Sequence, residues 1–236
     1  MREPLAGRPG DLFVDNRPVN RYIGQVTNRP PAANHRFYVG TSGWQYNHWR
    51  GVFYPESLKP NQYLIYMADV VYDNGVPKLT NKKLLIDNLQ TPYLRSIETQ
   101  NFVPPLENKM TFSGYGYQAT EVMLYDMETG KITNMSNADR QYDEPEGIFP
   151  DGKYTLVECD RQNMMGSNHV DLWKLKLDGS GELERLTFFS DYKGFKASNA
   201  VISDDGKYMA FQMAKSTDRA GVGYGIFIMD LTQSKK

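Results

Sequence analysis

The sequence contains a single cysteine, Cys159, and only three histidines in 236 residues. One cysteine excludes an internal disulfide framework, and no pair of the histidines has the spacing of a zinc motif. Lys and Arg (27) nearly balance Asp and Glu (28), so no bulk charge attracts nucleic acid or an anionic membrane. We therefore expect no histidine-based metal site and no nucleic-acid partner.

Long apolar runs are missing as well. The most apolar segment, residues 63–71, is interrupted by Asp69 and is far too short to cross a bilayer. Residues 1–7 lack the apolar core of a secretory signal, which leaves a cytoplasmic location open. No segment of ten or more residues has a helical pattern. We expect an all-β chain without membrane insertion.

Two similar stretches organise the sequence. Asp151-Gly152-Lys153-Tyr154 recurs as Asp205-Gly206-Lys207-Tyr208, and each follows a short apolar segment. Asp-Gly is typical of a tight turn between strands. The two glycines are separated by little more than the roughly 40–50 residues of a propeller blade. The repeat therefore predicts a β-propeller-like architecture.

The alternating segments predict short strands along most of the chain. They lie at residues 63–71, 82–87, 109–113, 121–126, 131–135, 153–159, 170–177, 183–188, 200–203, 207–213 and 225–231. Residues 95–102 form a polar stretch between two of them. We expect three to four recognisable four-stranded blades, of which the first begins at its third strand and the last lacks its fourth. The propeller is then incomplete unless residues 1–61 supply the missing strands.

The repeats resemble the PD40 (WD40-like) repeat of TolB-like propellers. The resemblance rests on residues 149–154, 203–208, 171–175 and 185–187, and it covers about residues 62–231. It implies a periplasmic or secreted location and a binding or scaffold role. Related propellers also occur in prolyl-oligopeptidase-type peptidases and in oligogalacturonate-lyase-like enzymes, so the resemblance specifies a fold more than a function.

A shorter stretch, residues 37–58, resembles the opening strand and loop of the DUF72 family, which has a TIM-barrel-like fold. The matching motifs are residues 40–44, 48–51 and 53–56. The strand–helix alternation of a barrel does not follow, so we do not predict a barrel. We divide the chain into an irregular N-terminal segment, 1–61, and a propeller region, 62–236.

Polar residues on the predicted inner strands are the candidate ligand-binding residues. Glu144 and Glu146 flank Pro145, Glu98 occupies the corresponding polar stretch of the preceding unit, and Glu158 stands near the end of the next strand. Inner strands line the central channel of a propeller, where polar side chains can hold a polar ligand or a cation. The predicted ligand-binding residues are Glu98, Gln100, Glu144, Glu146, Asp160 and Arg161. Hydrogen bonding between blades is the alternative role for them.

The sequence predicts a non-catalytic binding or scaffold module whose partner is a protein or a polysaccharide bound at the channel mouth. No serine-hydrolase elbow is present, we predict no catalytic residue, and no cofactor is expected apart from a divalent cation in the channel as an alternative. A second reading is a glycan-acting enzyme of the oligogalacturonate-lyase-like kind that uses Glu98, Glu144 and Glu146. The histidine-rich metal site of that family is not reproduced here.

Overall fold

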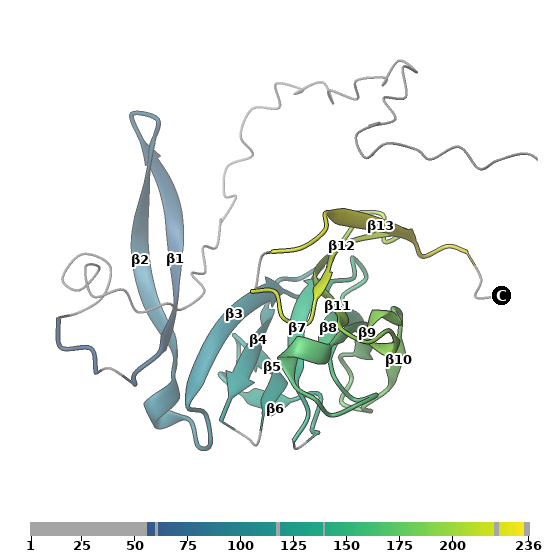
Figure 1. The fold of residues 1–236 in the computed structure, drawn as a ribbon. Helices are drawn as coiled ribbons and strands as arrows, with labels where there is room; N and C mark the ends of the chain where they lie inside the picture. The colour runs from purple at the N-terminus through teal and green to yellow at the C-terminus, as the bar shows by residue number, and fades with distance from the viewer. Residues whose placement is uncertain (1–55, 60, 117–118, 139, 220–221, 234–236) are drawn as a thin grey trace, which may run out of the picture. The chain divides into compact units, whose positions relative to one another are not determined.

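The computed structural model describes residues 56–59, 61–116, 119–138, 140–219 and 222–233. The chain divides into two compact units, Met1–His35 and Arg36–Lys236, and every described residue belongs to the second. The regular structure of these residues is almost entirely β (Figure 1). Among them, no helix has the length and apolar character needed to span a membrane. Most of the DUF72-like stretch lies outside the described residues, and the boundary at residue 61 remains a prediction.

The strands form four antiparallel sheets. A hairpin joins β1 (Leu64–Asp73) to β2 (Val76–Asp87). The first larger sheet, in spatial order, is β3 (Ser96–Phe102), β4 (Lys109–Tyr115), β5 (Thr120–Asp126) and β6 (Ile132–Asn134). The second contains β7 (Asp143–Ile148), β8 (Tyr154–Cys159), β9 (Asp171–Lys176) and β10 (Leu183–Arg185). The third has three strands, β11 (Phe195–Ile202), β12 (Tyr208–Lys215) and β13 (Ile226–Asp230). The predicted all-β, propeller-like fold is confirmed, with two complete four-stranded blades.

The repeated Asp-Gly turns form as the sequence predicts. The backbone N–H of Lys153 donates to the Asp151 carboxylate at 3.0 Å, and that of Lys207 donates to Asp205 at 3.1 Å. Gly152 and Gly206 have φ values of +68° and +72°, a left-handed conformation that glycine adopts without steric cost. Each turn connects the first strand of a sheet to the second.

Residues 96–102 differ from expectation, because the polar stretch is the strand β3. It pairs with β4 along its length and occupies the same edge position as β7 and β11 in their sheets. Its sequence lacks an apolar alternation because only Ile97 is buried, whereas several of its other side chains line a polar cavity. The strand is held by backbone pairing and by its neighbours rather than by an apolar face of its own.

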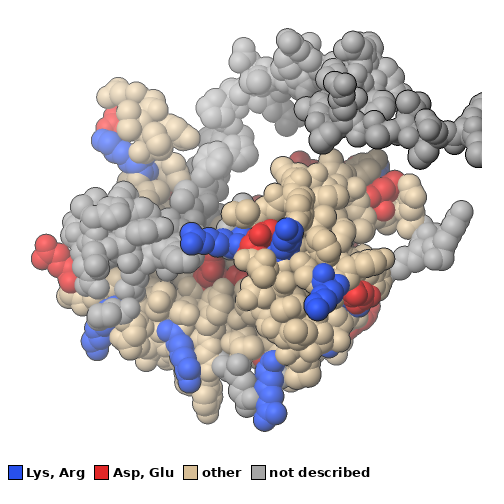
Figure 2. All heavy atoms as spheres, viewed as in Figure 1, with Lys and Arg blue, Asp and Glu red and all other residues tan. Residues whose placement is uncertain are grey.

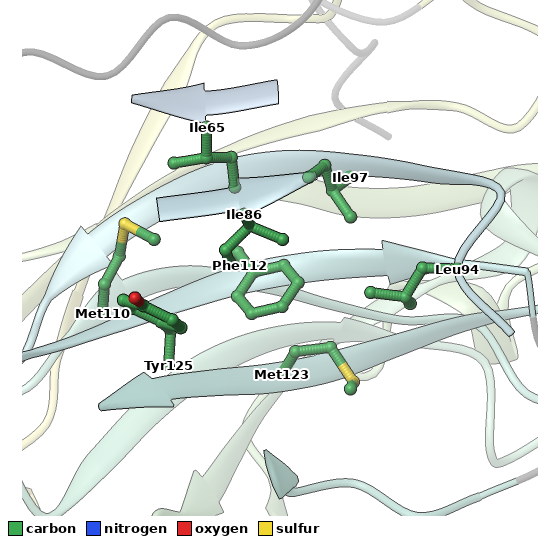
Figure 3. Packing of buried hydrophobic residues seen from close by; sticks show 8 residues of the cluster. All are labelled: Ile65, Ile86, Leu94, Ile97, Met110, Phe112, Met123 and Tyr125. Atoms are coloured by element: carbon green, nitrogen blue, oxygen red, sulfur yellow. The ribbon is translucent and has the colours of Figure 1, made fainter. Parts of the chain in front are cut away.

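The first core cluster joins the hairpin to the first sheet. Figure 3 shows Ile65 and Ile86 of the hairpin above Phe112 of β4. The other members come from β3, β4, β5 and the segment before β3: Leu94, Ile97, Met110, Met123 and Tyr125. Because hydrophobic burial is the main favourable term in folding, this cluster is what attaches the hairpin to the blades.

Two further clusters lie between successive sheets. Val122 and Met135 of the first sheet region pack with Val157 and Leu175 of the second. On its other face, the second sheet places Leu156 and Leu172 against the third sheet, whose contributors include Ala197, Ala200, Met209 and Phe211. Alternate residues of a strand point to opposite faces, so the second sheet is apolar on both faces and is covered on both.

A buried carboxylate at the start of the third strand of each complete sheet ties down the segment after the fourth strand. In the second sheet, Asp171 accepts hydrogen bonds from the Thr187 hydroxyl at 2.7 Å and the Phe189 backbone N–H at 2.8 Å. In the first sheet, Glu121 accepts from the Ser136 hydroxyl and from the Ala138 backbone N–H. The two sites occupy equivalent positions, so the repeat extends to buried polar contacts.

We expect Asp171→Ala to lower the free energy of unfolding by about 3–5 kcal/mol, because it leaves the Arg185 guanidinium, 2.7 Å from the Asp171 carboxylate, without its buried partner. Urea denaturation followed by tryptophan fluorescence measures the change. Asp191→Ala is the matched control, since Asp191 also pairs with Arg185 but its side chain is half exposed; its effect should stay within about 1 kcal/mol. Equal losses in the two variants would contradict this role of Asp171.

Candidate functional site

A cavity of about 860 Å³ lies where the inner strands of the three larger sheets meet. Its lining includes residues of β3, β7, β8 and β11, and one side is formed by β1 residues together with Phe102 and Met110. Acidic side chains are visible in a hollow near the centre of Figure 2, with basic side chains beside them. The volume falls in the range of small-ligand sites, roughly 300–1,000 Å³.

Each of the three inner strands carries an irregularity at the same place. The pairing register shifts between Thr99 and Phe102 in β3, between Pro145 and Ile148 in β7, and between Ser198 and Val201 in β11. A β-bulge redirects the side chains of the extra residues. The bulged segments contain Gln100, Asn101, Glu146 and Asn199, and all four line the cavity. The repeated bulge therefore supplies the polar surface of the site.

Two tyrosines hold the carboxylate of Glu144. The Tyr115 hydroxyl donates to Glu144 Oε1 at 2.8 Å and reaches Glu98 Oε2 at 3.3 Å, and the Tyr142 hydroxyl donates to Glu144 Oε2. Burial raises the pKa of both phenols far above the ordinary tyrosine value, and the charge of Glu144 raises it further. Both phenols therefore stay protonated and act as hydrogen-bond donors.

Glu146 and Glu158 face each other beside Glu144. One carboxyl oxygen from each of these three residues lies within 4.8 Å of the others. Burial raises the pKa of Glu146, and the charges of Glu158 and Glu144 raise it further. Burial, followed by the charge of Glu144, also raises the pKa of Glu158, which forms a side-chain hydrogen bond with Glu146. Like charges in a buried site disfavour double ionisation, so the surroundings favour the protonated form of these two carboxyls.

Close backbone contact between β7 and β11 fixes this geometry. A Cβ atom on Gly147 would lie 2.9 Å from the Cα of Val201 and 3.0 Å from the carbonyl oxygen of Ala200, so only glycine fits there. The backbone N–H of Asn199 donates to Glu158 Oε1 at 2.6 Å. These contacts bring residues from β7, β8 and β11 together at one point.

Four of the six residues predicted as ligand-binding, Glu98, Gln100, Glu144 and Glu146, line the cavity. Asp160 and Arg161 do not line it. Asp160 is buried and accepts hydrogen bonds from the backbone N–H groups of Tyr142 and Gly166 at 2.8 and 2.6 Å. Arg161 contacts Asp143 at 3.1 Å. Both residues follow the end of β8 at Cys159, where the chain has left the inner face. Their hydrogen bonds and ion pair hold neighbouring segments of the chain together.

Sequence reasoning did not select Tyr115, Tyr142 or Asn199, and it named Glu158 without including it in the six predicted ligand-binding residues. The sequence did indicate Glu158, because it lies two residues after Leu156 on an apolar strand. Alternate residues of a strand face the same side, so the carboxylate shares the face of that buried leucine. No pattern in the sequence pointed to the two tyrosines, since a tyrosine has an apolar ring and a polar hydroxyl and suits both a core and a surface. Asn199 enters the site only through the bulge.

Carboxylate oxygens are the ligands that hard divalent cations prefer. Glu144, Glu146 and Glu158 could supply three of them, so their chemistry fits the divalent cation that the sequence leaves open. That ion remains a prediction.

Comparison with known proteins gives two partial resemblances. A family model described as "Protein of unknown function DUF72" matches residues 38–72. Of that range, the structure describes residues 56–59 and 61–72, which include most of β1. No curated protein matches the chain.

Solved structures resemble this chain in fold. A TolB-like protein from Agrobacterium tumefaciens is 17% identical with a TM-score of 0.52, and the match covers 71% of this chain and 57% of that one. TolB from Acinetobacter baumannii is 20% identical with a TM-score of 0.47, over 72% of this chain and 39% of that one. A puromycin hydrolase matches at 12% identity and a TM-score of 0.49, over 75% of this chain and 24% of the other. The fold is that of a TolB-like β-propeller, and this chain spans about half the length of the TolB chains it matches.

We expect Glu146→Gln to stabilise the protein increasingly as the pH rises. The pKa of Glu146 is raised in the folded state above the unfolded value of about 4.3. Its contribution to stability is therefore complete below about pH 4.3 and is lost as the pH rises toward the folded-state pKa. Glutamine cannot ionise and escapes this loss. One pKa unit is worth about 1.4 kcal/mol, and each kcal/mol shifts Tm by roughly 2–4 °C at this chain length.

The measurement is the thermal midpoint of wild type and variant between about pH 4 and about pH 8, in chelator. The gap in favour of Glu146→Gln should be small at the acidic end and exceed about 3 °C at pH 8. Glu107→Gln, which removes an exposed carboxylate outside the cavity, should show no such trend. A pH-independent gap would mean that Glu146 is not held among other carboxyls.

Proposed function

We propose that this chain is a non-catalytic binding or scaffold module of the TolB-like propeller type, whose cavity binds a cationic group of a protein partner. The observation that carries the proposal is the group Glu144, Glu146 and Glu158, with oxygens within 4.8 Å of one another in a cavity of about 860 Å³. A lysine or arginine side chain among these carboxyls would form a direct ion pair with them. Charge-assisted hydrogen bonds of that kind are roughly twice as strong as neutral ones.

The charge of the cavity favours this class of ligand over an acidic glycan. The acidic lining residues are Glu98, Glu144, Glu146, Glu158 and Asp218, and the basic ones are Lys196 and Arg219. An oligogalacturonate chain would bring further negative charge to this surface, which like-charge repulsion disfavours. A neutral polysaccharide meets no such barrier, and Tyr66 and Phe102 of the lining offer rings for stacking.

A glycan-acting enzyme is the second candidate, and one observation favours it. Burial raises the pKa of Glu146 and of Glu158, and a carboxyl with a raised pKa is the kind of group that serves as the general acid in glycoside hydrolysis. The repeated Asp-Gly-Lys-Tyr motif supports a PD40-type assignment. A periplasmic or secreted location remains part of the proposal and rests on the resemblance alone.

The test is calorimetric titration of the full chain with capped Gly-Lys-Gly, Gly-Arg-Gly and Gly-Gln-Gly peptides at neutral pH. We expect the two cationic peptides to bind and the glutamine peptide not to bind. Glu146→Gln combined with Glu158→Gln should weaken binding at least tenfold, which corresponds to about 1.4 kcal/mol. Glu107→Gln should leave binding unchanged.

The same chain is then incubated with neutral oligosaccharides, with and without calcium or magnesium. Release of shortened products that is lost in Glu146→Gln would establish the enzyme and overturn the non-catalytic module. Binding of oligosaccharide without product, in the absence of cationic peptide binding, would assign the cavity to a polysaccharide. Tight binding of the metal ion alone would place a cation at the three carboxyls.

A further inference from the structure

The acidic cavity also contains a buried positive charge. Lys196 of β11 lines the cavity, and only 7% of this residue is exposed. Its ammonium donates one hydrogen bond, to the backbone carbonyl oxygen of Asp218 at 3.3 Å. No carboxylate in the described part of the chain forms an ion pair with it. Because a lysine ammonium has three N–H donors, two of them are left without an acceptor among the described residues.

The register of β11 directs this lysine toward the cavity. Ala197 and Ala200 belong to the apolar cluster between the second and third sheets. Lys196 and Ser198 lie two residues apart, share the other face of the strand, and both line the cavity. Lysine is almost never buried in a protein unless it is paired. A buried lysine that faces a cavity with two free donors therefore indicates that the cavity takes an anionic group.

Lys196 lies near the three carboxyls of Glu144, Glu146 and Glu158 without pairing with them. Burial and the charge of Glu144 raise the pKa of Glu158, and the charge of Lys196 is among the influences that lower it. The nearest contact of Glu158 Oε1 across the sheets is with the backbone N–H of Asn199, at 2.6 Å. The cavity thus holds positive and negative groups that do not neutralise each other by direct contact.

We propose that Lys196 is an anion subsite of this cavity, and that the ligand is a protein segment carrying a carboxylate beside the lysine or arginine that the three carboxyls hold. The inference rests on the proposed function, because the cationic group of the same segment binds among those carboxyls. The ligand carboxylate accepts the two free N–H groups of Lys196, and such charge-assisted hydrogen bonds are the strong ones. The subsite adds selectivity, since a cationic segment without a carboxylate leaves the buried ammonium unsatisfied.

The charge of the cavity favours a carboxylate over a phosphate group. A carboxylate brings one negative charge, whereas a phosphate group brings about 1.5–2 at neutral pH. Glu98 lines the same cavity as the three carboxyls, so a more highly charged anion meets more repulsion than one buried ammonium offsets. Arg219 also lines the cavity but is exposed, and solvent and salt screen its charge.

The experiment is calorimetric titration of the full chain with capped Gly-Lys-Glu-Gly and capped Gly-Lys-Gln-Gly. The two peptides differ only in the charge of one side chain, and we expect the glutamate peptide to bind about tenfold more tightly. Peptides with the glutamate two or three residues after the lysine test the spacing. Acetyl-Gly-Lys with a free carboxylate tests whether the anion is instead the end of a chain, and the tightest binder identifies the source.

Lys196→Met removes the ammonium and keeps an unbranched side chain. In this variant the preference for glutamate should fall to within about twofold. Gly-Lys-Gln-Gly should bind no more weakly than to the wild type, because the charge that repels its lysine is gone. Lys193→Met is the matched control: Lys193 is exposed and does not line the cavity, so its replacement should leave the preference intact. Circular dichroism checks that each variant keeps its β structure, and the wild-type comparison of the peptides does not depend on any variant.

The outcomes separate this inference from the proposed function. Lysine peptides that bind equally well with glutamate or glutamine at every spacing, and no better with a free carboxylate, would overturn the anion subsite and leave the cationic ligand standing. A preference for glutamate that survives Lys196→Met would also overturn the subsite. Binding of capped Gly-Gln-Glu-Gly that depends on Lys196, without binding of Gly-Lys-Gln-Gly, would support the subsite and overturn the cationic ligand. Failure of every peptide to bind would overturn both.

Discussion

The packing of one sheet face against the next is the interaction on which the rest of this structure depends. No sheet here buries its apolar residues by itself: Val157 and Leu175 need the first sheet, and Leu156 and Leu172 need the third. Hydrophobic burial scales with apolar area removed from water, so each blade is stable only beside a neighbour. On the outer face of the third sheet, where no described sheet packs, Ile226 and Ile228 are exposed.

The acidic cavity is a consequence of that packing. Stacked sheets bring their inner strands together, and the bulges of β3, β7 and β11 direct polar side chains into the space between them. Pairing of β7 with β8 places Glu146 beside Glu158, and the close contact at Gly147 brings β11 against this pair, where the backbone N–H of Asn199 donates to Glu158. Burying like charges costs stability. Locally unfavourable arrangements of this kind cluster at functional sites.

The sequence predicted much of the fold because its strongest signals are local. Asp151-Gly152 and Asp205-Gly206 specify turns through their own backbone preferences, and alternating strands such as β9 specify their buried face by period two. The polar strand β3 was not predicted as a strand, since its residues face a cavity and show no apolar alternation. For the site, Glu98, Gln100, Glu144 and Glu146 could be found because inner strands are recognisable by position in the repeat. Asp160 and Arg161 are near in sequence but lie beyond the strand end.

By itself, the sequence determined the class of fold, the repeat and the inner-strand carboxyls, because turn chemistry and side-chain period act over a few residues. Only the tertiary structure decided which carboxyls meet. Glu158 reaches Glu146 through strand pairing within the second sheet, and the backbone N–H of Asn199 reaches Glu158 only when the third sheet stacks on the second. Tyr115 and Glu144 likewise belong to different sheets. Contacts between residues far apart in the chain depend on register, bulges and stacking together, and no local pattern of residues encodes that combination.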